Sequence, residues 1–169
     1  MTGKTHVAFG AGIAMLGSVY YASNGYDMAS NSLLFAGCIL GSLFPDIDSP
    51  KSILSQHIPL LPKIINKVFG HRNFIHSPFF LALLSYGIIY FYPDAKHFIY
   101  GFILGFCSHL LLDMCNRAGI PIFYPISKYR FHFLDTKSGA KYEFITASIL
   151  YFIIFCLFIL FLSGKLSIL

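Results

Sequence analysis

The chain has 169 residues, of which 56% are hydrophobic and only 11% are charged, whereas about one quarter of the residues of a soluble domain are charged. This composition excludes an ordinary soluble domain and predicts a single integral membrane domain over residues 1–169. The net charge of +5 then points to membrane sidedness and anionic lipid headgroups, and we expect no nucleic-acid partner. The four cysteines fall in or beside apolar runs without a CxxC pair, so we interpret them as buried, unpaired thiols.

Five apolar segments follow one another and predict an all-α fold, a polytopic bundle of about five transmembrane helices. They are residues Val7–Ala22, Ser32–Phe44, Pro78–Tyr92, Phe98–Cys115 and Phe144–Leu162. Several are shorter than the roughly 20 residues that cross a bilayer comfortably, the second most clearly, so flanking residues must contribute. We expect the first segment to be a retained helix, because no cleavage site of small residues follows MTGKTH.

The connections between these segments alternate between short and long. If all five segments span, the long loops Pro45–Ser77 and Asn116–Glu143 share the face of the N-terminus. All but two of the 12 Lys and Arg residues lie on that face, the exceptions being Lys96 and Lys165. The positive-inside rule therefore predicts a protein of the inner or plasma membrane with its N-terminus and both long loops in the cytoplasm.

Two stretches of the long loops combine apolar residues with cations. IPLLPKIINKVF, residues Ile58–Phe69, has apolar residues at helical spacing and Lys63 and Lys67 on another face. It predicts either a short helix at the membrane interface or an ordinary helix packed on the bundle. YPISKYRFHF, residues Tyr124–Phe133, could bind headgroups, and an ordinary interfacial aromatic belt accounts for it equally well.

Ionisable residues at the ends of the apolar segments gather on one face of the membrane. Because successive helices alternate in direction, the ends that carry these residues are all cytoplasmic ends. They are His6, Asp46, Asp48, His71, Arg72, His76, His109, Asp113 and Glu143. A charge at the middle of a membrane helix costs about 2.5 kcal/mol or more, so a cluster directed at one point indicates a functional site.

His109 and Asp113, in GFCSHLLLD, lie four residues apart on one helix face and could bind one metal ion. Alternatively they form a hydrogen-bonded pair that caps the helix, and Asp46 and Asp48 could simply end a helix and begin a turn. Imidazole and carboxylate together suit zinc, manganese or iron. Two such ions about 3.5 to 4 Å apart can activate a water and hold the oxygens of a phosphate ester, and Arg72 could bind a phosphate oxygen.

Four motifs in order resemble one known family. FPDIDSPKS, GHRNFIHS, GFCSHLLLDMCNRAGIPIFYP and KSGAKYEF are similar to the YdjM-like family, described as LexA-regulated, membrane-bound, metal-dependent hydrolases of bacteria. The similarity runs from His6 to about Phe144. That family is grouped with the zinc-dependent phospholipase C and single-strand nuclease superfamily, so the resemblance implies a helical metal site of the zinc-phospholipase-C type.

The resemblance also implies roles for single residues. His109 and Asp113 match the HxxxD pair of the superfamily, with Asp113 as the bridging ligand. The remaining ligands implied are His6, His76, one of Asp46 and Asp48, and His71 as a ligand or a neighbour of one. Secreted members of the superfamily begin with a Trp whose amino group binds zinc, whereas this chain contains no Trp, so the resemblance extends to two metal ions rather than three.

We therefore expect a metal-dependent hydrolase that cleaves a phosphoester, such as a phospholipid or another lipid-linked phosphate, by means of a metal-activated water. Arg72 would stabilise charge on the phosphate, and Glu143 or Asp48 would be the general base. Membrane lipids and the phosphoester substrate are the expected partners. Two alternatives remain: a metal-binding or metal-transport protein, which would need ligands at mid-membrane depth, and a non-catalytic scaffold whose polar cluster holds no metal.

Overall fold

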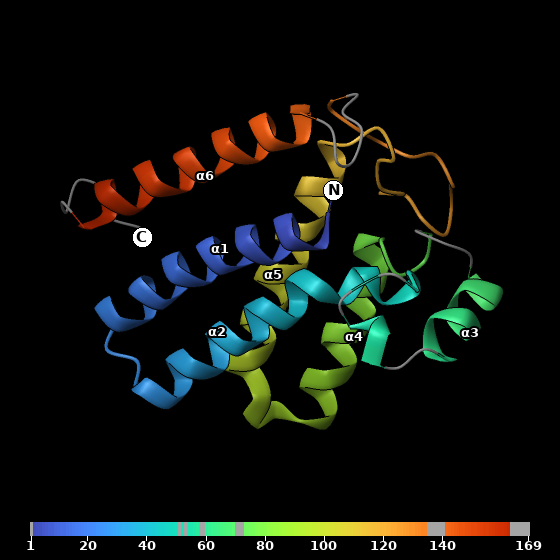
Figure 1. Ribbon diagram of the computed structural model, residues 1–169. Coiled ribbons are helices and arrows are strands. Elements are labelled where there is room, and N and C mark those ends of the chain that lie inside the picture. Colours follow the sequence, from blue (N-terminus) through green and yellow to red (C-terminus); the bar gives the residue numbers. More distant parts are fainter. Residues whose placement is uncertain are drawn as a thin grey trace.

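The computed structural model describes residues 2–50, 52, 54–57, 60–69, 73–134 and 141–162, and most of these are helical (Figure 1). In chain order, the helices are α1 (Gly3–Ser23), α2 (Met28–Leu43), the 3-10 helices η1 (Phe44–Asp48) and η2 (Ser55–His57), α3 (Leu60–Phe69), α4 (Pro78–Phe91), η3 (Pro93–Ala95), α5 (Lys96–Met114) and α6 (Lys141–Leu162). Extended pairing in this part of the chain is limited to one isolated bridge between Ile120 and Phe131. The predicted all-α fold is confirmed.

Two helices begin at side-chain caps that the local sequence supplies. Asp27 accepts a hydrogen bond from the backbone N–H of Ser30 and starts α2. Ser77 accepts from the N–H of Phe80 and starts α4, whose first residue is Pro78. Such caps satisfy N–H groups that have no partner within the helix, and proline suits the first helical position because its missing N–H is not needed there. The cap at Ser77 fixes the chain immediately after His76.

The centre of the molecule is the contact between α2 and α5, where glycines let the two backbones approach. A methyl group added at Gly37 or Gly41 would overlap the backbone of α5, and one added at Gly101 or Gly105 would overlap the backbone of α2. Small residues four apart allow this close packing in membrane helices. The contacts advance in the same direction along both helices, so α2 and α5 run parallel and both end at the same end of the bundle.

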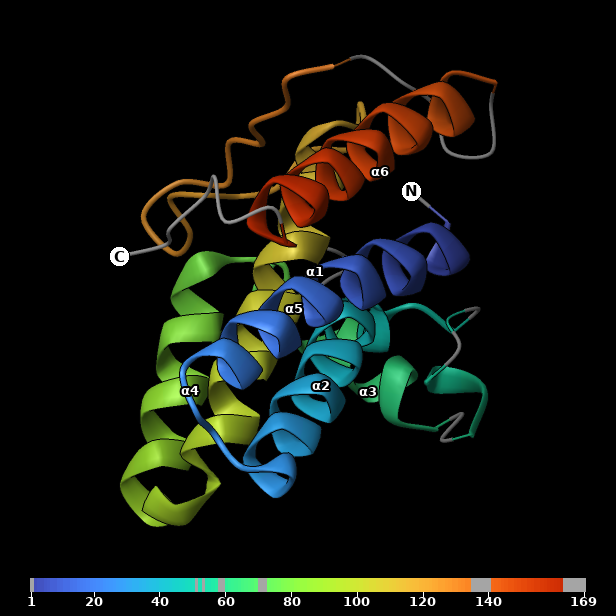
Figure 2. The same cartoon turned by 90° about the vertical axis from the view of Figure 1, so that its left-hand side faces the viewer.

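The other helices pack around this pair with their polar ends at that same end. α1 lies against both α2 and α5, with Gly17 near Leu104 and Tyr21 hydrogen-bonded to His97, so it runs antiparallel to α5. α4 and α5 form a hairpin through η3, and α6 packs on α1 (Figures 1 and 2). The predicted alternation of helix direction is therefore present, and it brings the start of α1 beside the ends of α2 and α5.

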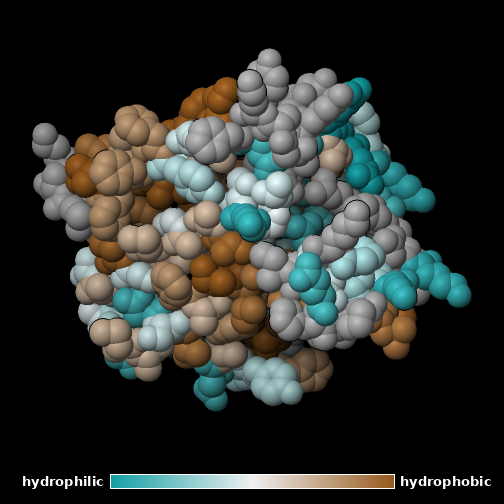
Figure 3. Space-filling view, viewed as in Figure 1, coloured by the Kyte–Doolittle hydropathy of each residue, from teal (hydrophilic) through white to brown (hydrophobic). Residues whose placement is uncertain are grey.

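All five predicted apolar segments are helices, and the surface over them is largely hydrophobic (Figure 3). In the described part of the chain, two stretches, Met28–Asp48 and Pro93–Met114, are long and apolar enough to cross a membrane. The apolar stretches Pro78–Phe91 and Ile145–Leu160 are shorter. The prediction that five helices span the membrane therefore stays a prediction. In the view of Figure 3, hydrophilic residues gather on the side of the molecule where α3 lies.

Candidate metal centre

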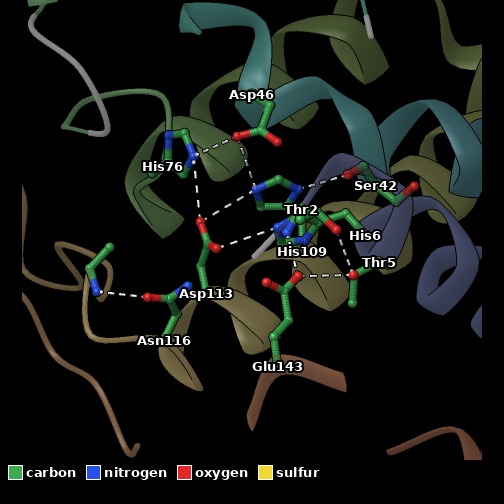
Figure 4. Close-up of polar contacts among 11 residues, drawn as sticks. Thr2, Thr5, His6, Ser42, Asp46, His76, His109, Asp113, Asn116 and Glu143 are labelled. Atoms are coloured by element: carbon green, nitrogen blue, oxygen red, sulfur yellow. Dashed lines mark hydrogen bonds and ion pairs between the residues drawn. The ribbon is translucent and has the colours of Figure 1, made fainter. Parts of the chain in front are cut away.

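Four separate parts of the chain bring histidines and carboxylates together at one point inside the bundle (Figure 4). His6 lies in the first turns of α1, Asp46 lies in η1, His76 directly precedes the cap of α4, and His109 and Asp113 lie in the last two turns of α5. The four residues other than Asp46 have no exposed surface, and the Asp46 side chain is 14% exposed. Five of the residues predicted from the sequence therefore meet in one buried cluster.

Asp113 is central to this cluster because each of its oxygens faces a different imidazole. Its Oδ1 lies 3.4 Å from His6 Nε2, while its Oδ2 lies 3.5 Å from His109 Nε2 and 3.7 Å from His76 Nε2. Asp46 closes the other side, with its Oδ1 at 3.7 Å from His76 Nε2 and 3.9 Å from His109 Nε2. Two carboxylates and three imidazole nitrogens thus surround one small volume.

These distances fit metal ligands better than direct hydrogen bonds. A hydrogen bond between nitrogen and oxygen is usually about 2.7–3.2 Å long. Two atoms that each lie about 2.0–2.1 Å from a zinc ion at a tetrahedral angle are instead about 3.4 Å apart. Two groups of donors have all their atoms within 4.8 Å of one another: His6 with Asp46 and His109, and His76 with His109 and Asp113.

The buried nitrogens of the histidines support the same interpretation. Both ring nitrogens of His6, both of His76 and Nε2 of His109 make no hydrogen bond with the described residues. Buried polar atoms are rarely left without a partner, because their desolvation costs about 1–3 kcal/mol each. The Nε2 atoms of all three histidines face Asp113, and a metal ion at this point would give them a partner, so the residues present fit a divalent metal.

His109 is held in the orientation that a metal ligand needs. Its Nδ1 lies 2.7 Å from the backbone oxygen of Ser42, and because a carbonyl can only accept, Nδ1 carries the proton and donates it. In the neutral ring, Nε2 then has a free lone pair directed at Asp46 and Asp113. The His6 ring stacks on the His109 ring, with 3.7 Å between centroids and 12° between planes, which limits rotation of both.

The structure places Asp46 and Asp48 on different sides of His76. His76 lies between them: its Nε2 faces Asp46 and Asp113, while its Nδ1 faces Asp48 Oδ2 at 3.7 Å. Asp48 is 1% exposed and belongs to neither donor group. A carboxylate on the far nitrogen of a ligating histidine orients the ring and makes it a better ligand. This geometry favours Asp46 as the ligand and Asp48 as the residue that orients His76.

Electrostatics also favour a cation here. Burial lowers the pKa of His76, and the neighbouring carboxylates only partly oppose this effect, so its ring is neutral near pH 7 and available as a ligand. Three carboxylates, those of Asp46, Asp48 and Asp113, lie around this largely buried volume. Concentrated buried charge is costly unless it is paired or coordinates a metal. A divalent cation would offset much of it.

Comparison with known proteins identifies the family. The sequence profile described as "YdjM inner membrane protein" matches residues 1–167. The chain belongs to the YdjM inner membrane protein family.

Three bacterial relatives cover different shares of the chain. A Bacillus subtilis (strain 168) protein named "Uncharacterized protein YvsG" is 35% identical over 125 residues, which is 74% of each chain. The "Inner membrane protein YdjM" of Escherichia coli (strain K12) is 38% identical over 113 residues, or 62% of this chain and 56% of that protein. The protein of the same name from Shigella flexneri has the same identity and coverage. No solved structure gave a significant match.

Glu143 of this YdjM-family chain holds the first turn of α1. Its Oε1 accepts hydrogen bonds from the backbone N–H of Thr2 at 2.6 Å and from the Thr5 hydroxyl at 3.0 Å. Thr2 makes no side-chain cap hydrogen bond. The Glu143 carboxylate of α6 therefore caps α1, the helix that carries His6. Glu143 is 4% exposed and belongs to neither donor group, and its predicted role as general base stays a prediction.

His71 and Arg72 lie outside the described residues, so their predicted roles stay predictions. His97 is at the opposite end of the bundle, where its Nδ1 lies 3.2 Å from the hydroxyl of Tyr21. Sequence reasoning missed the Ser42 carbonyl that orients His109, because a backbone oxygen has no sequence signature; only its place in the last turn of α2, beside a glycine contact, could have suggested it.

Proposed function

We propose that this membrane protein is a metal-dependent hydrolase that cleaves a phosphoester at the buried cluster. The observation that supports this proposal most strongly is the set of buried imidazole nitrogens facing Asp46 and Asp113 at 3.5–3.9 Å, without hydrogen bonds to the described residues. Nitrogen and oxygen donors in this combination suit zinc, with manganese or iron as alternatives. The zinc-phospholipase-C-like site expected from the sequence agrees with this donor set.

The residues have distinct tasks in this proposal. His6, His76, His109 and Asp46 would hold the metal, and Asp113, whose two oxygens face different histidines, would be the ligand shared by two ions. When bound, the metal supplies a Lewis acid that polarises a phosphoryl oxygen and lowers the pKa of a water molecule. Asp48 orients His76 and is the nearer candidate for the general base, since Glu143 already accepts two hydrogen bonds through Oε1.

The substrate would approach past η1. Asp46, on η1, is the partly exposed member of the cluster, at 14%, whereas its partners are fully buried. Arg72 is four residues before His76 in the sequence, and in the proposal it binds an oxygen of the phosphate and offsets its developing charge. A phospholipid or a lipid-linked phosphate is the proposed substrate, reached from the cytoplasmic side of the inner membrane, where the positive-inside rule places this end.

The test is to purify the protein in detergent, measure its bound transition metals, and assay a panel of phospholipids and simple phosphodiesters. We expect bound metal and hydrolysis in the natural sequence, and loss of both in Asp113→Ala, because that residue faces three histidines. Ser85→Ala is the matched control, since Ser85 is a buried polar residue of α4 that belongs to neither donor group. Hydrolysis that survives Asp113→Ala would contradict the assignment of the site.

A second candidate is a metal-binding protein without catalytic activity. The complete burial of His6, His76, His109 and Asp113 favours it, because a catalytic metal must keep a position open for water and substrate. Stoichiometric metal that is lost in Asp113→Ala, together with no hydrolysis of any phosphoester in the panel, would favour this candidate. Absence of any bound transition metal would instead support a scaffold with a structural cluster.

A further inference from the structure

One face of α3 presents apolar and cationic side chains together. Leu60, Lys63, Ile64 and Lys67 follow the helical spacing of one face, and all four are exposed, Leu60 by 67% and Ile64 by 52%. The sequence places no acidic residue between positions 60 and 69. The two lysines thus lie on the same face as exposed apolar residues, as in helices that rest in the headgroup region of a membrane.

Residues 121–134 are not helical, and they too combine exposed apolar side chains with cations. Phe123, Ile126, Tyr129 and Phe133 are exposed by 64%, 94%, 68% and 63%, and the side chain of Lys128 is exposed among them. This stretch also contains no acidic residue. Exposed aromatic and aliphatic side chains beside cations are typical of protein surfaces that contact the membrane interface.

Both segments are attached to the parts of the chain that carry the metal donors. α3 packs on η1, which carries Asp46. In the second segment, Arg130 donates to the Asn73 side chain at 2.9 Å, three residues before His76. The backbone N–H of Phe133 donates to the Met114 carbonyl at 2.7 Å, directly after Asp113.

The two segments flank the end of the bundle that holds the metal donors. They lie at one end in Figure 1 and on opposite sides of that end in Figure 2. We call the exposed face of α3 and residues 121–134 together the collar. It contributes Lys63, Lys67, Lys128 and Arg130, whereas the turns at the opposite end contain Asp27, Asp94 and Lys96.

We propose that the collar binds the anionic headgroup layer of the leaflet on the metal-site side. Its apolar side chains enter the boundary between headgroups and acyl chains, while its cations contact lipid phosphates. An anionic membrane surface attracts each nearby Lys or Arg by about 1 kcal/mol, or about fivefold in binding. The collar's charge therefore directs it to anionic lipid, and the opposite end, with its acidic residues, has no such preference.

Tryptophan reporters test the proposal, because the natural chain contains no Trp. Ile64→Trp and Ile126→Trp place one reporter in each segment, and Met28→Trp, at an 81% exposed position of the far end, is the matched control. The full-length protein is reconstituted in nanodiscs of phosphatidylcholine with or without phosphatidylglycerol. Both collar reporters should shift to shorter emission wavelength and be quenched by chain-brominated lipid more strongly when phosphatidylglycerol is present, whereas the Met28→Trp emission should not respond to it.

Charge reversal tests whether the cations of the collar cause the response to anionic lipid. Lys63→Glu with Lys67→Glu should abolish the phosphatidylglycerol response of the Ile64→Trp reporter, and Lys128→Glu should weaken that of the Ile126→Trp reporter. Collar reporters that stay water-exposed in both lipids, or that respond equally to both, would overturn the proposal. The proposal would also be overturned if the collar reporters emit at shorter wavelength in detergent, in a way that depends on protein concentration. The collar would then be an interface between copies of the chain.

The collar does not depend on the proposed catalysis. The same reporters in a His109→Ala background should respond to phosphatidylglycerol as before, even though that substitution removes a proposed metal ligand. If the reporters respond to phosphatidylglycerol in the natural background but not in the His109→Ala background, lipid binding by the collar depends on the metal site. That result would contradict the proposal that the collar is a separate lipid-binding surface. Failure of the hydrolysis assay would leave the outcome of the reporter experiment unchanged.

Discussion

At the scale of single residues, the two carboxylates of the FPDIDSP motif differ in position because they lie in a 3-10 helix. With three residues per turn, side chains two residues apart point to different sides of the helix. Asp46 therefore reaches the space between His76 and His109, while Asp48 reaches the other nitrogen of His76. Sequence spacing alone left both as candidates, and the geometry of η1 distinguishes them.

This difference predicts unequal losses of metal affinity. Asp46→Ala removes a proposed ligand and should abolish tight metal binding, whereas Asp48→Ala should weaken metal binding about 10- to 100-fold, the usual cost of losing a residue that orients a ligand. Each variant loses one carboxylate, so the change in charge is matched. Competition of each purified variant with a chelator measures the affinities. A larger loss of metal affinity in Asp48→Ala than in Asp46→Ala would mean that Asp48 is the ligand and Asp46 the orienting residue.

At the scale of helices, the start of α1 depends on α6. The Glu143 carboxylate binds the N–H of Thr2 and the hydroxyl of Thr5, while the Tyr151 hydroxyl donates to the Thr5 carbonyl at 3.1 Å. Caps of this kind stabilise a helix start by about 0.5–2 kcal/mol. His6 follows Thr5 directly, so the orientation of its ring depends on contacts made by a helix more than 130 residues later in the chain.

We therefore expect Glu143→Ala to reduce metal affinity about tenfold, at the low end of the effects of residues that orient ligands. Glu143→Gln should retain most of the affinity, because its amide oxygen can still accept from Thr2 and Thr5. Tyr151→Phe removes a different contact between the same helices and is the control for general loosening of α6. Equal damage from the Gln and Ala variants would instead point to a role for the negative charge, as a general base would have.

At the scale of the whole molecule, the site joins α1, η1, the turn before α4, and the end of α5. A metal that binds the folded protein and not the unfolded chain stabilises the fold by about 2.7 kcal/mol at a free concentration 100 times its dissociation constant. Zinc should therefore raise the thermal transition of the detergent-solubilised protein, and a chelator should reverse the shift. The Asp113→Ala protein should show no shift, and a similar shift in that variant would mean that zinc binds elsewhere.

Much of this arrangement was predictable from the sequence because a membrane constrains the chain strongly. Apolar segments that alternate in direction bring His6, Asp46, His76 and Asp113 to one end without any further information, and their meeting in the cluster is the prediction that the structure confirms most directly. Contacts made by backbone atoms, such as the Ser42 carbonyl, were not predictable. They depend on how closely the glycines of α2 and α5 let the two helices approach.

The order of the donors along the chain has a consequence for biosynthesis. The first, His6, leaves the ribosome more than one hundred residues before the last, Asp113, with which it pairs across 3.4 Å. A growing chain that extends only to the end of η1 holds His6, Asp46 and Asp48 but not Asp113, the carboxylate that faces all three imidazoles. In the proposed metal protein, the full donor set exists only once α5 has been made, so the ion would have to be delivered after insertion of that helix.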